Sequence, residues 1–151
     1  MLTSKIIKYP TVPEEIKKPI EAIAKMVIDY NLELGIPDPQ FDVPVFVREW
    51  GAGTQHILGF YHGEELVGFL LSSTQQDRYT SRKFVLVESI YVKPAYRTEG
   101  TENVELAILT MRAYAKTLGV ASCRVHANPQ FVEFLKGHGG EIVYTGMEVP
   151  V

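Results

Sequence analysis

The chain has 151 residues, of which 46% are hydrophobic and 22% are charged, and its formal net charge is −3. This composition is typical of a globular protein that buries a core of its own, so we expect a single domain over residues 1–151. A small negative charge leaves no basic surplus to neutralise phosphates, which argues against a nucleic-acid partner. No apolar run approaches the roughly 18 residues that cross a bilayer, so no membrane contact is expected either.

The first part of the chain predicts a strand, a helix and a loop. The strand covers residues 5–9, and Thr11 and Glu14 then have the spacing of a helix capping box. Pro19 either kinks the first turn of this helix or marks its true start. Gly35 ends the helix, and a loop follows to residue 44. The helix is indicated by apolar residues that recur in steps of three and four, namely Ile16, Ile20, Ile23, Val27, Tyr30 and Leu34.

The middle of the chain predicts mostly strands. Residues 45–50 are assigned to a short helix, with Asp42 suited to its start. Two apolar runs, 57–61 and 66–72, flank a turn that contains Gly63, which is typical of an antiparallel hairpin. A polar loop over 73–82 then leads to a strand over 84–92.

The last third predicts two helices and two strands. Apolar residues at helical spacing and a following Gly119 indicate a helix over 101–118. A strand over 122–126, a short helix over 129–136 and a strand over 141–149 complete the chain. Strands that alternate with helices in this way predict a mixed sheet with helices packed against it.

This order of elements resembles the GNAT (GCN5-related N-acetyltransferase) fold over nearly the whole chain. The segment Glu-Ser-Ile-Tyr-Val-Lys-Pro-Ala-Tyr-Arg, residues 88–97, is similar to the family's fourth strand and the entry to its cofactor loop. The resemblance implies an α/β (α+β) protein with a single, mixed, mostly antiparallel sheet of about six or seven strands and about four flanking helices.

The resemblance also implies a site for acetyl-CoA after that strand. In the family the loop reads Arg/Gln-x-x-Gly-x-Gly/Ala, and its amides hold the pyrophosphate at a helix amino terminus. Arg97 and Gly100 match this pattern, whereas Thr98 and Glu102 depart from it, and Glu102 has the wrong charge for a phosphate. Acidic residues in a first turn also stabilise a helix by themselves, which is the alternative interpretation. The implied cofactor-binding residues are Ile90, Tyr91, Val92, Arg97, Thr98, Gly100, Thr101, Glu102 and Asn128.

Two catalytic residues follow from the same resemblance. Glu88 occupies the position of the carboxylate that takes a proton from the substrate amine, and we expect burial among apolar neighbours to raise its pKa. The alternative is a solvated glutamate on the strand surface. The family's general acid is the Tyr of a Phe-Tyr pair, but this chain has Phe134 and Leu135 there. Tyr144 is our candidate replacement, with Tyr91 and Tyr96 as further alternatives.

The histidines and the cysteine give no metal site. His126 is the histidine best placed to line the cleft, while the others lie at predicted turns or strand ends and are expected to be solvated. No pair has metal-ligand spacing on a helix. The single Cys123 excludes an internal disulfide and is interpreted as a small buried apolar residue in a reducing compartment, the cytoplasm. The three expected solvated histidines are His56, His62 and His138.

Two functions fit these residues. The first is transfer of an acetyl group from acetyl-CoA to an amine of a small molecule or a protein. The second is a non-catalytic GNAT-fold protein with a decayed acetyl-CoA loop that forms a homodimer or contacts an assembly partner. Residues 128–136, followed by Gly139 and Gly140, are also similar to GNAT-like proteins of tailed phages that act in head assembly or inside the virion.

Overall fold

The computed structural model describes residues 1–98, 100, 102–125, 129–137, 139–140 and 149–150. Within these residues five strands form one sheet in the order β1-β2-β3-β4-β5. The first three pairings are antiparallel and the β4–β5 pairing is parallel, which confirms the mixed, mostly antiparallel sheet. Five strands are fewer than predicted, and the expected strand 141–149 lies almost wholly outside the described residues. The strands are β1 (Thr3–Ile7), β2 (Gln55–His62), β3 (Glu65–Gln76), β4 (Lys83–Val92) and β5 (Ser122–Val125).

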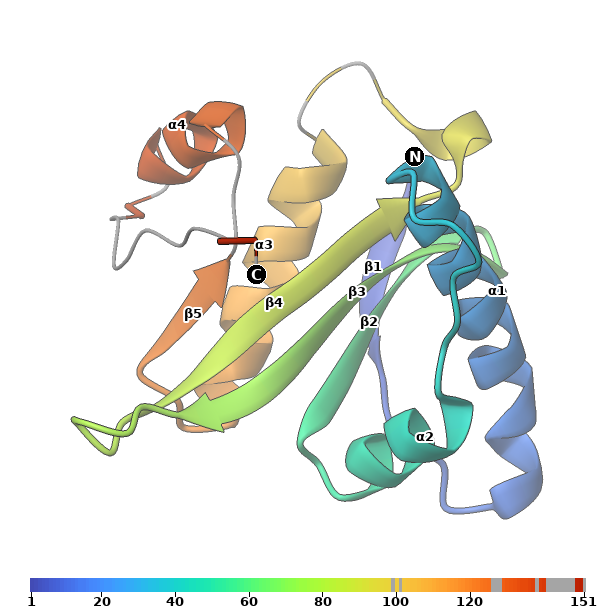
Figure 1. Ribbon diagram of the computed structural model, residues 1–151, viewed down its shortest axis with the longest axis horizontal. Coiled ribbons are helices and arrows are strands. Elements are labelled where there is room, and N and C mark those ends of the chain that lie inside the picture. Colours follow the sequence, from blue (N-terminus) through green and yellow to red (C-terminus); the bar gives the residue numbers. More distant parts are fainter. Residues whose placement is uncertain (99, 101, 126–128, 138, 141–148, 151) are drawn as a thin grey trace.

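Helices cover both faces of the sheet (Figure 1). On one face lie α1 (Lys17–Glu33) and α2 (Val43–Gly51), and on the other lies α3 (Glu102–Thr117). The fourth helix, α4 (Pro129–Gly137), follows β5, and single 3-10 turns lie at Pro13–Glu15 and Pro94–Tyr96. The fold is therefore three-layered.

Each face of the sheet has its own apolar core. Strand residues alternate between the two cores because successive side chains point to opposite faces. On β2 and β3, Ile57, Phe69 and Leu71 pack under α1 and α2. Their neighbours Leu58 and Leu70 pack under α3 instead. The two cores are the reason that β2 and β3 read as continuous apolar runs in the sequence.

The start of α1 differs from the prediction. The residue before the 3-10 turn is Val12, which makes no side-chain cap, so the capping box expected of Thr11 and Glu14 is wrong. The α-helix begins at Lys17, and Pro19 is its third residue. Amides in the first turn have no partner within a helix, so a proline there removes no hydrogen bond. This position decides the question that the sequence left open: Pro19 lies in the first turn.

The short helix α2 is confirmed, and it begins before the predicted residue 45. The Asp42 carboxylate caps it by accepting a hydrogen bond from the Val45 amide at 3.1 Å. At the other end of the helix, Trp50 Nε1 donates to the Ile7 carbonyl of β1 at 3.2 Å. The first contact caps the helix, and the second fixes its end against the edge strand β1.

Part of the predicted polar loop 73–82 belongs to the sheet. Ser73–Gln76 pair with Lys83–Leu86, so the sheet partner outweighs the low strand preference of these polar residues. The turn that follows is held by Asp77, whose Oδ1 accepts from the amides of Tyr79 and Thr80. The backbone hydrogen bonds from Thr80 and Tyr79, and a side-chain hydrogen bond from Arg124 of β5, lower the pKa of Asp77 to about 2.

Arg124 joins the beginning of β5 to the beginning of β4. Its Nη2 lies 3.2 Å from Asp77 Oδ2, and its guanidinium lies 3.8 Å from the centre of the Phe84 ring. An arginine over an aromatic face and beside a carboxylate makes two favourable electrostatic contacts. The two strands are therefore tied together at the end where they start.

Candidate active site at the fork between β4 and β5

The parallel strands β4 and β5 separate halfway along β4. Their pairing runs from Phe84 and Ser122 to Val87 and Val125, where β5 ends. The last five residues of β4, 88–92, have no strand beside them on that edge among the described residues. Figure 1 shows the two arrows diverging from a common start. This fork leaves backbone groups of β4 open to a ligand.

A β-bulge lies at the branch point of the fork. Leu71 of β3 is opposite Ser89, and the next residue, Ser72, is opposite Val87. Glu88 is therefore the extra residue of a bulge on β4. A bulge bends its strand and turns a side chain in a new direction. Here it falls on the first residue after the last β4–β5 pair.

Glu88 lies on the face of the sheet that carries α1 and α2. Gln55, two residues before the core residue Ile57 on β2, donates from Nε2 to both Glu88 carboxylate oxygens, at 3.4 and 3.5 Å. The Glu88 side chain is exposed. The expected burial of this carboxylate is wrong, because strand alternation after Val85 and Val87, which pack under α3, places Glu88 on the opposite face of the sheet. An accessible carboxylate stands at the branch point instead.

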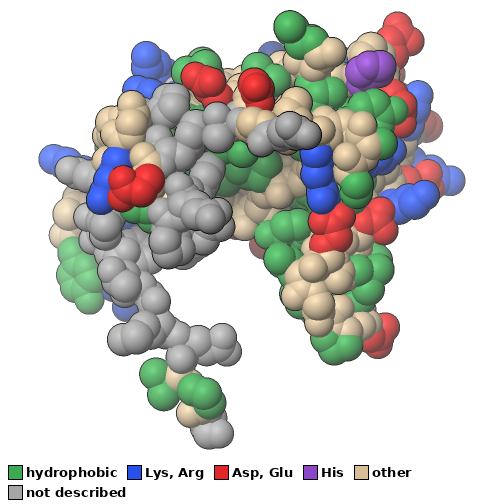
Figure 2. Space-filling model, turned by 90° about the horizontal axis from the view of Figure 1, so that it is seen from above, with side chains coloured by type: hydrophobic (Ala, Val, Ile, Leu, Met, Phe, Trp, Pro, Cys, Tyr) green, Lys and Arg blue, Asp and Glu red, His purple; other side chains and the backbone are tan. Residues whose placement is uncertain are grey.

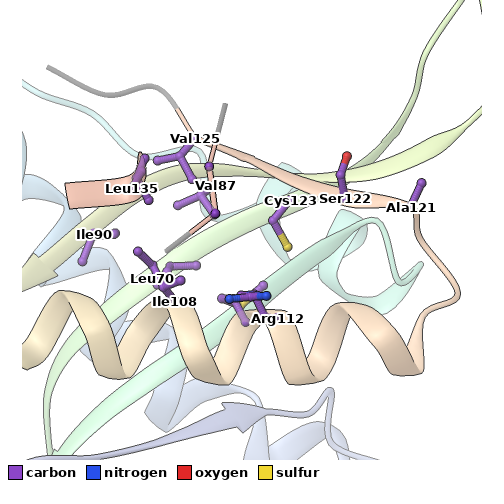
Figure 3. A pocket seen from close by; sticks show the side chains of 13 residues that line it. Leu70, Val87, Ile90, Ile108, Arg112, Ala121, Ser122, Cys123, Val125 and Leu135 are labelled. Atoms are coloured by element: carbon purple, nitrogen blue, oxygen red, sulfur yellow. The ribbon is translucent and has the colours of Figure 1, made fainter. Parts of the chain in front are cut away.

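A cavity of about 380 Å³ lies on the opposite face, between α3 and the fork. Val87, Ile90 and Val125 line it at the branch point, and all three pack with the core under α3. Leu135 of α4 closes one end, and Figure 3 shows these side chains above α3. The fork thus has a mostly apolar cavity on one face of the sheet and a carboxylate on the other.

Cys123 and Arg112 lie at the other end of this cavity (Figure 3). Burial raises the pKa of the Cys123 thiol, and the nearby Arg112 charge opposes this rise. The thiol is half-buried and packs against the core under α3. A thiol with a raised pKa stays protonated at neutral pH and is a poor nucleophile. Cys123 therefore acts as a small apolar residue, as the sequence indicates.

The tyrosines considered as general acids have other contacts. Tyr91 is 4% exposed and stacks on Phe69 with ring centres 5.8 Å apart, and burial, followed by the charges of Glu33 and Asp29, raises its pKa. Tyr96 donates its hydroxyl to Glu65 at 3.0 Å, which raises the pKa of that tyrosine. The Tyr96 hydroxyl is thus taken by Glu65, and Tyr91 packs in the core under α1 and α2 and does not line the cavity. Tyr144 lies outside the described residues.

Arg97, the first residue of the expected cofactor loop, is engaged by groups of this chain. Its Nη2 lies 2.8 Å from both carboxylate oxygens of Glu33 at the end of α1. Its Nε donates to the Val92 carbonyl at 2.7 Å, and its guanidinium lies 5.4 Å from the centre of the Tyr91 ring. The side chains of Arg97 and Glu33 are 42% and 41% exposed, so the ion pair contributes about 0–1 kcal/mol. Arg97 nevertheless already has a carboxylate partner.

Figure 2 looks down on this end of the molecule, where basic side chains lie directly against acidic ones. Glu102 is the first residue of α3, and its side chain is exposed. A Cβ built onto Gly100 would lie 2.5 Å from Glu102 Oε2 and 2.8 Å from Oε1. The Glu102 carboxylate therefore lies close to Gly100 and places a negative charge at the start of α3. Thr98 is also exposed and donates weakly to the Gly100 carbonyl at 3.5 Å. Thr101 and Asn128 lie outside the described residues.

The expected position of acetyl-CoA can be tested against these contacts. Its acyl end fits the fork, because an apolar cavity and the open edge of β4 meet there. Its pyrophosphate does not fit the loop, because the Glu102 carboxylate covers Gly100 and Glu33 neutralises Arg97. The residues expected to bind cofactor therefore divide into two groups: Ile90, Tyr91 and Val92 at the fork, and the loop residues.

His56 is buried, although the sequence predicts that it is solvated. Only 4% of the residue is exposed, and its ring nitrogens bond Thr74 Oγ1 at 2.6 Å and the Tyr114 hydroxyl of α3 at 3.2 Å. Burial lowers its pKa. The alternation of β2 carries the missed signal, since His56, Leu58 and Phe60 share one face of the strand.

Of the other histidines, the structure describes His62. His62 is exposed, as predicted, and His126 and His138 lie outside the described residues. Within the described ranges, no three His, Cys, Asp or Glu side chains are grouped closely enough to hold a metal ion. In the same part of the chain, no helix has the length and apolar character needed to cross a membrane.

The described residues thus form a mixed α/β fold whose sheet forks at a bulge between β4 and β5. The family described as acetyltransferase (GNAT) matches residues 22–139. The chain therefore belongs to the GNAT family, whose reaction is acyl transfer. No curated protein matches the chain significantly.

Solved GNAT structures share the fold at low sequence identity. An aminoglycoside acetyltransferase from an uncultured soil metagenomic sample, in complex with sisomicin, has a TM-score of 0.73 and 10% identity, covering 99% of this chain and 96% of the other. A ribosomal-protein-alanine N-acetyltransferase from Brucella melitensis has a TM-score of 0.66 and 15% identity, with 100% and 99% covered. A predicted acetyltransferase with acetyl-CoA from Clostridium acetobutylicum has a TM-score of 0.69 and 14% identity, covering 99% of this chain and 96% of the other. These likenesses concern the fold.

Proposed function

We propose that this protein transfers an acyl group from a thioester to an amine at the fork between β4 and β5. The observation that carries the proposal is the pair of features on opposite faces of the branch point. The apolar cavity lined by Val87 and Ile90 suits the acyl thioester, and the exposed carboxylate of Glu88 suits the amine. The two reactants then approach each other from opposite sides of the sheet.

The proposed step is direct transfer. The amine nitrogen attacks the thioester carbonyl carbon, the C–N bond forms, and the C–S bond breaks to release a thiolate. Glu88 accepts the proton that the nitrogen loses, directly or through one water. Backbone N–H groups between Ile90 and Val92, on the open edge of β4, stabilise the developing negative charge on the carbonyl oxygen. The thiolate then takes a proton, for which Tyr144 is our candidate donor and solvent is the alternative source.

The reaction does not require a dedicated acid residue. Holding amine and thioester in reacting geometry lowers a barrier by up to about 7–11 kcal/mol. Leu135 supplies no proton at the end of the cavity, and Tyr144 stays our candidate for that role. The proposal includes acetyl as the acyl group, a small-molecule or protein amine as the acceptor, a single domain over residues 1–151 and a cytoplasmic setting.

The test is release of thiol from S-acetyl-pantetheine and acetyl-CoA in the presence of a panel of primary amines. Glu88→Gln keeps the size of the side chain and removes the base, so we expect kcat to fall about 100-fold or more. Glu64→Gln, in the exposed β2–β3 turn, is the matched control and keeps full activity. Equal activity of native protein and Glu88→Gln contradicts the role of this carboxylate.

A second candidate is a non-catalytic GNAT-fold protein that binds a partner or a second copy of itself. The specific observations in its favour are Leu135 in place of a proton donor and the Glu102 carboxylate against Gly100. This candidate predicts no thiol release above the uncatalysed rate with any amine, and no effect of Glu88→Gln. The similarity to tailed-phage proteins stays a prediction from the sequence.

A further inference from the structure

The amino terminus of α3 carries its own anion. A Cβ built onto Gly100 would lie 2.5 Å from Glu102 Oε2, so the carboxylate rests directly against that glycine. Helix amino termini attract negative charge because their amides are unpaired and the helix dipole is positive there. The Glu102 side chain supplies that charge from within the chain. A phosphate at the same place would meet a carboxylate of like charge.

The basic residue of the loop is likewise satisfied internally. Arg97 Nη2 lies 2.8 Å from both oxygens of Glu33, a residue 64 positions earlier in the chain. Its Nε is used by the Val92 carbonyl at 2.7 Å. A phosphate that bound Arg97 would have to displace Glu33 from Nη2. Two carboxylates from different helices thus take both contacts that a pyrophosphate would use.

The fork end of the site has the opposite character. The cavity beside Val87, Ile90 and Val125 is lined mostly by apolar side chains, and no carboxylate lines it among the described residues. An uncharged pantetheine arm with its acyl group suits these surroundings, since burial of apolar surface drives its binding.

We infer that this chain recognises the acyl-pantetheine part of its donor and not the pyrophosphate. The inference rests on the proposed acyl transfer for the position of the donor. It defines the substrate class as acyl thioesters of pantetheine, irrespective of the phosphates or nucleotide beyond the arm. Glu102 is the residue that excludes the pyrophosphate, and Glu33 assists it by neutralising Arg97.

The test compares acetyl-CoA with S-acetyl-pantetheine, which lacks every phosphate, by calorimetry on the full chain. The native protein binds the two donors with dissociation constants that agree within about threefold, because the phosphates gain no net contact. Glu102→Gln removes one repulsive charge and tightens acetyl-CoA about tenfold, while S-acetyl-pantetheine is unchanged. Glu33→Gln frees Arg97 and tightens acetyl-CoA by a smaller factor, about threefold.

Glu15→Gln is the matched control. It removes a carboxylate from the 3-10 turn at Pro13–Glu15, at the other end of the molecule from the start of α3 (Figure 1), and changes neither affinity. Native binding of acetyl-CoA more than about tenfold tighter than S-acetyl-pantetheine overturns the inference. So does an affinity for acetyl-CoA that Glu102→Gln leaves unchanged, including the case in which neither protein binds it.

Thiol release by the same proteins separates this inference from the proposed function. If Glu102→Gln gains acetyl-CoA affinity and no protein transfers acetyl groups, donor discrimination stands and acyl transfer fails. If the native chain transfers acetyl groups and binds acetyl-CoA far more tightly than S-acetyl-pantetheine, acyl transfer stands and discrimination fails.

Discussion

The branch point of the fork and the loop after β4 differ in how much space and charge they leave for a ligand. At the branch point, Val87 and Glu88 border an apolar cavity on one face and present a carboxylate on the other. At the far end, Arg97 is paired with Glu33 and Gly100 is covered by Glu102. Among the described residues, the branch point has a cavity and a β4 edge with no strand beside it, whereas the loop is satisfied by charges of the chain itself. A family fold can therefore keep the geometry of its reaction site while its binding loop is modified independently.

Two glycines compare how tightly the sheet and the loop after β4 are packed. A Cβ at Gly68 would lie 2.5 Å from the Tyr91 carbonyl oxygen and 3.0 Å from Val92 Cα, which are backbone atoms of β4. Gly68→Ala therefore forces the β3–β4 pair apart, and we expect the free energy of unfolding to fall by about 2–3 kcal/mol. Urea denaturation measures this loss.

Gly100→Ala is the matching variant in the loop after β4. The added methyl group would also lie 2.5 Å from an atom, but that atom is the end of the flexible Glu102 side chain. Rotation of the side chain relieves the contact, so we expect a change below about 0.5 kcal/mol. Equal losses in the two variants would mean that the loop is packed as tightly as the sheet, and the comparison would be wrong.

A pair of neighbouring residues on α3 tests the cavity. Ile108 lines it, whereas Leu109 does not and is 52% exposed. Ile108→Phe adds volume inside the cavity, and we expect affinity for S-acetyl-pantetheine to fall about tenfold, a change of about 1.4 kcal/mol. Leu109→Phe makes the same chemical class of change on the surface and leaves the affinity unaltered. Calorimetry at one temperature measures the affinity of each variant for S-acetyl-pantetheine. Equal affinities of the two variants would place the donor elsewhere.

The smallest effect concerns His56, which joins α3 to the sheet next to the fork. Burial lowers its pKa below the ordinary 6.5, so the folded chain binds this proton less readily than the unfolded chain. The stabilising contribution of neutral His56 is complete above pH 6.5 and is lost as pH falls from there through the lowered folded pKa. We therefore expect this group to contribute less stability at pH 5 than at pH 7.5.

Substitution of the histidines isolates that contribution. His56→Gln removes this part of the pH dependence, while His62→Gln, at an exposed position, retains it. Urea denaturation at the two pH values measures both variants. A native pH dependence that survives in His56→Gln would assign it to other groups.

Much of the fold is predictable from the sequence because its periodic patterns are strong. The helix predicted over 101–118 is α3 at Glu102–Thr117, and the hairpin and the short helix after Asp42 are confirmed. The missed strand residues Ser73–Gln76 are polar, and their pairing with Lys83–Leu86 is a tertiary effect that local sequence does not carry.

The site is less predictable because it depends on breaks in pattern. The bulge at Glu88 shifts the alternation of the residues after it, so that Ile90 and Val92 join Val87 under α3, and one extra residue in a strand has no distinct sequence signal. The wrong charge of Glu102 is visible in the sequence. Its contact with Gly100 and the pairing of Arg97 with Glu33 are not, because the first depends on a side-chain direction and the second joins two distant segments.

Whether the donor contacts the fork and not the loop is tested most directly by an NMR titration of the native chain with acetyl-CoA. Backbone amide shifts are followed residue by residue. We expect shifts at Val87 to Val92 and at Val125, which border the fork, and none at Gly100 and Glu102. Shifts at Gly100 and Glu102 as large as those at the fork would contradict this expectation, because they would show the pyrophosphate in contact with the loop.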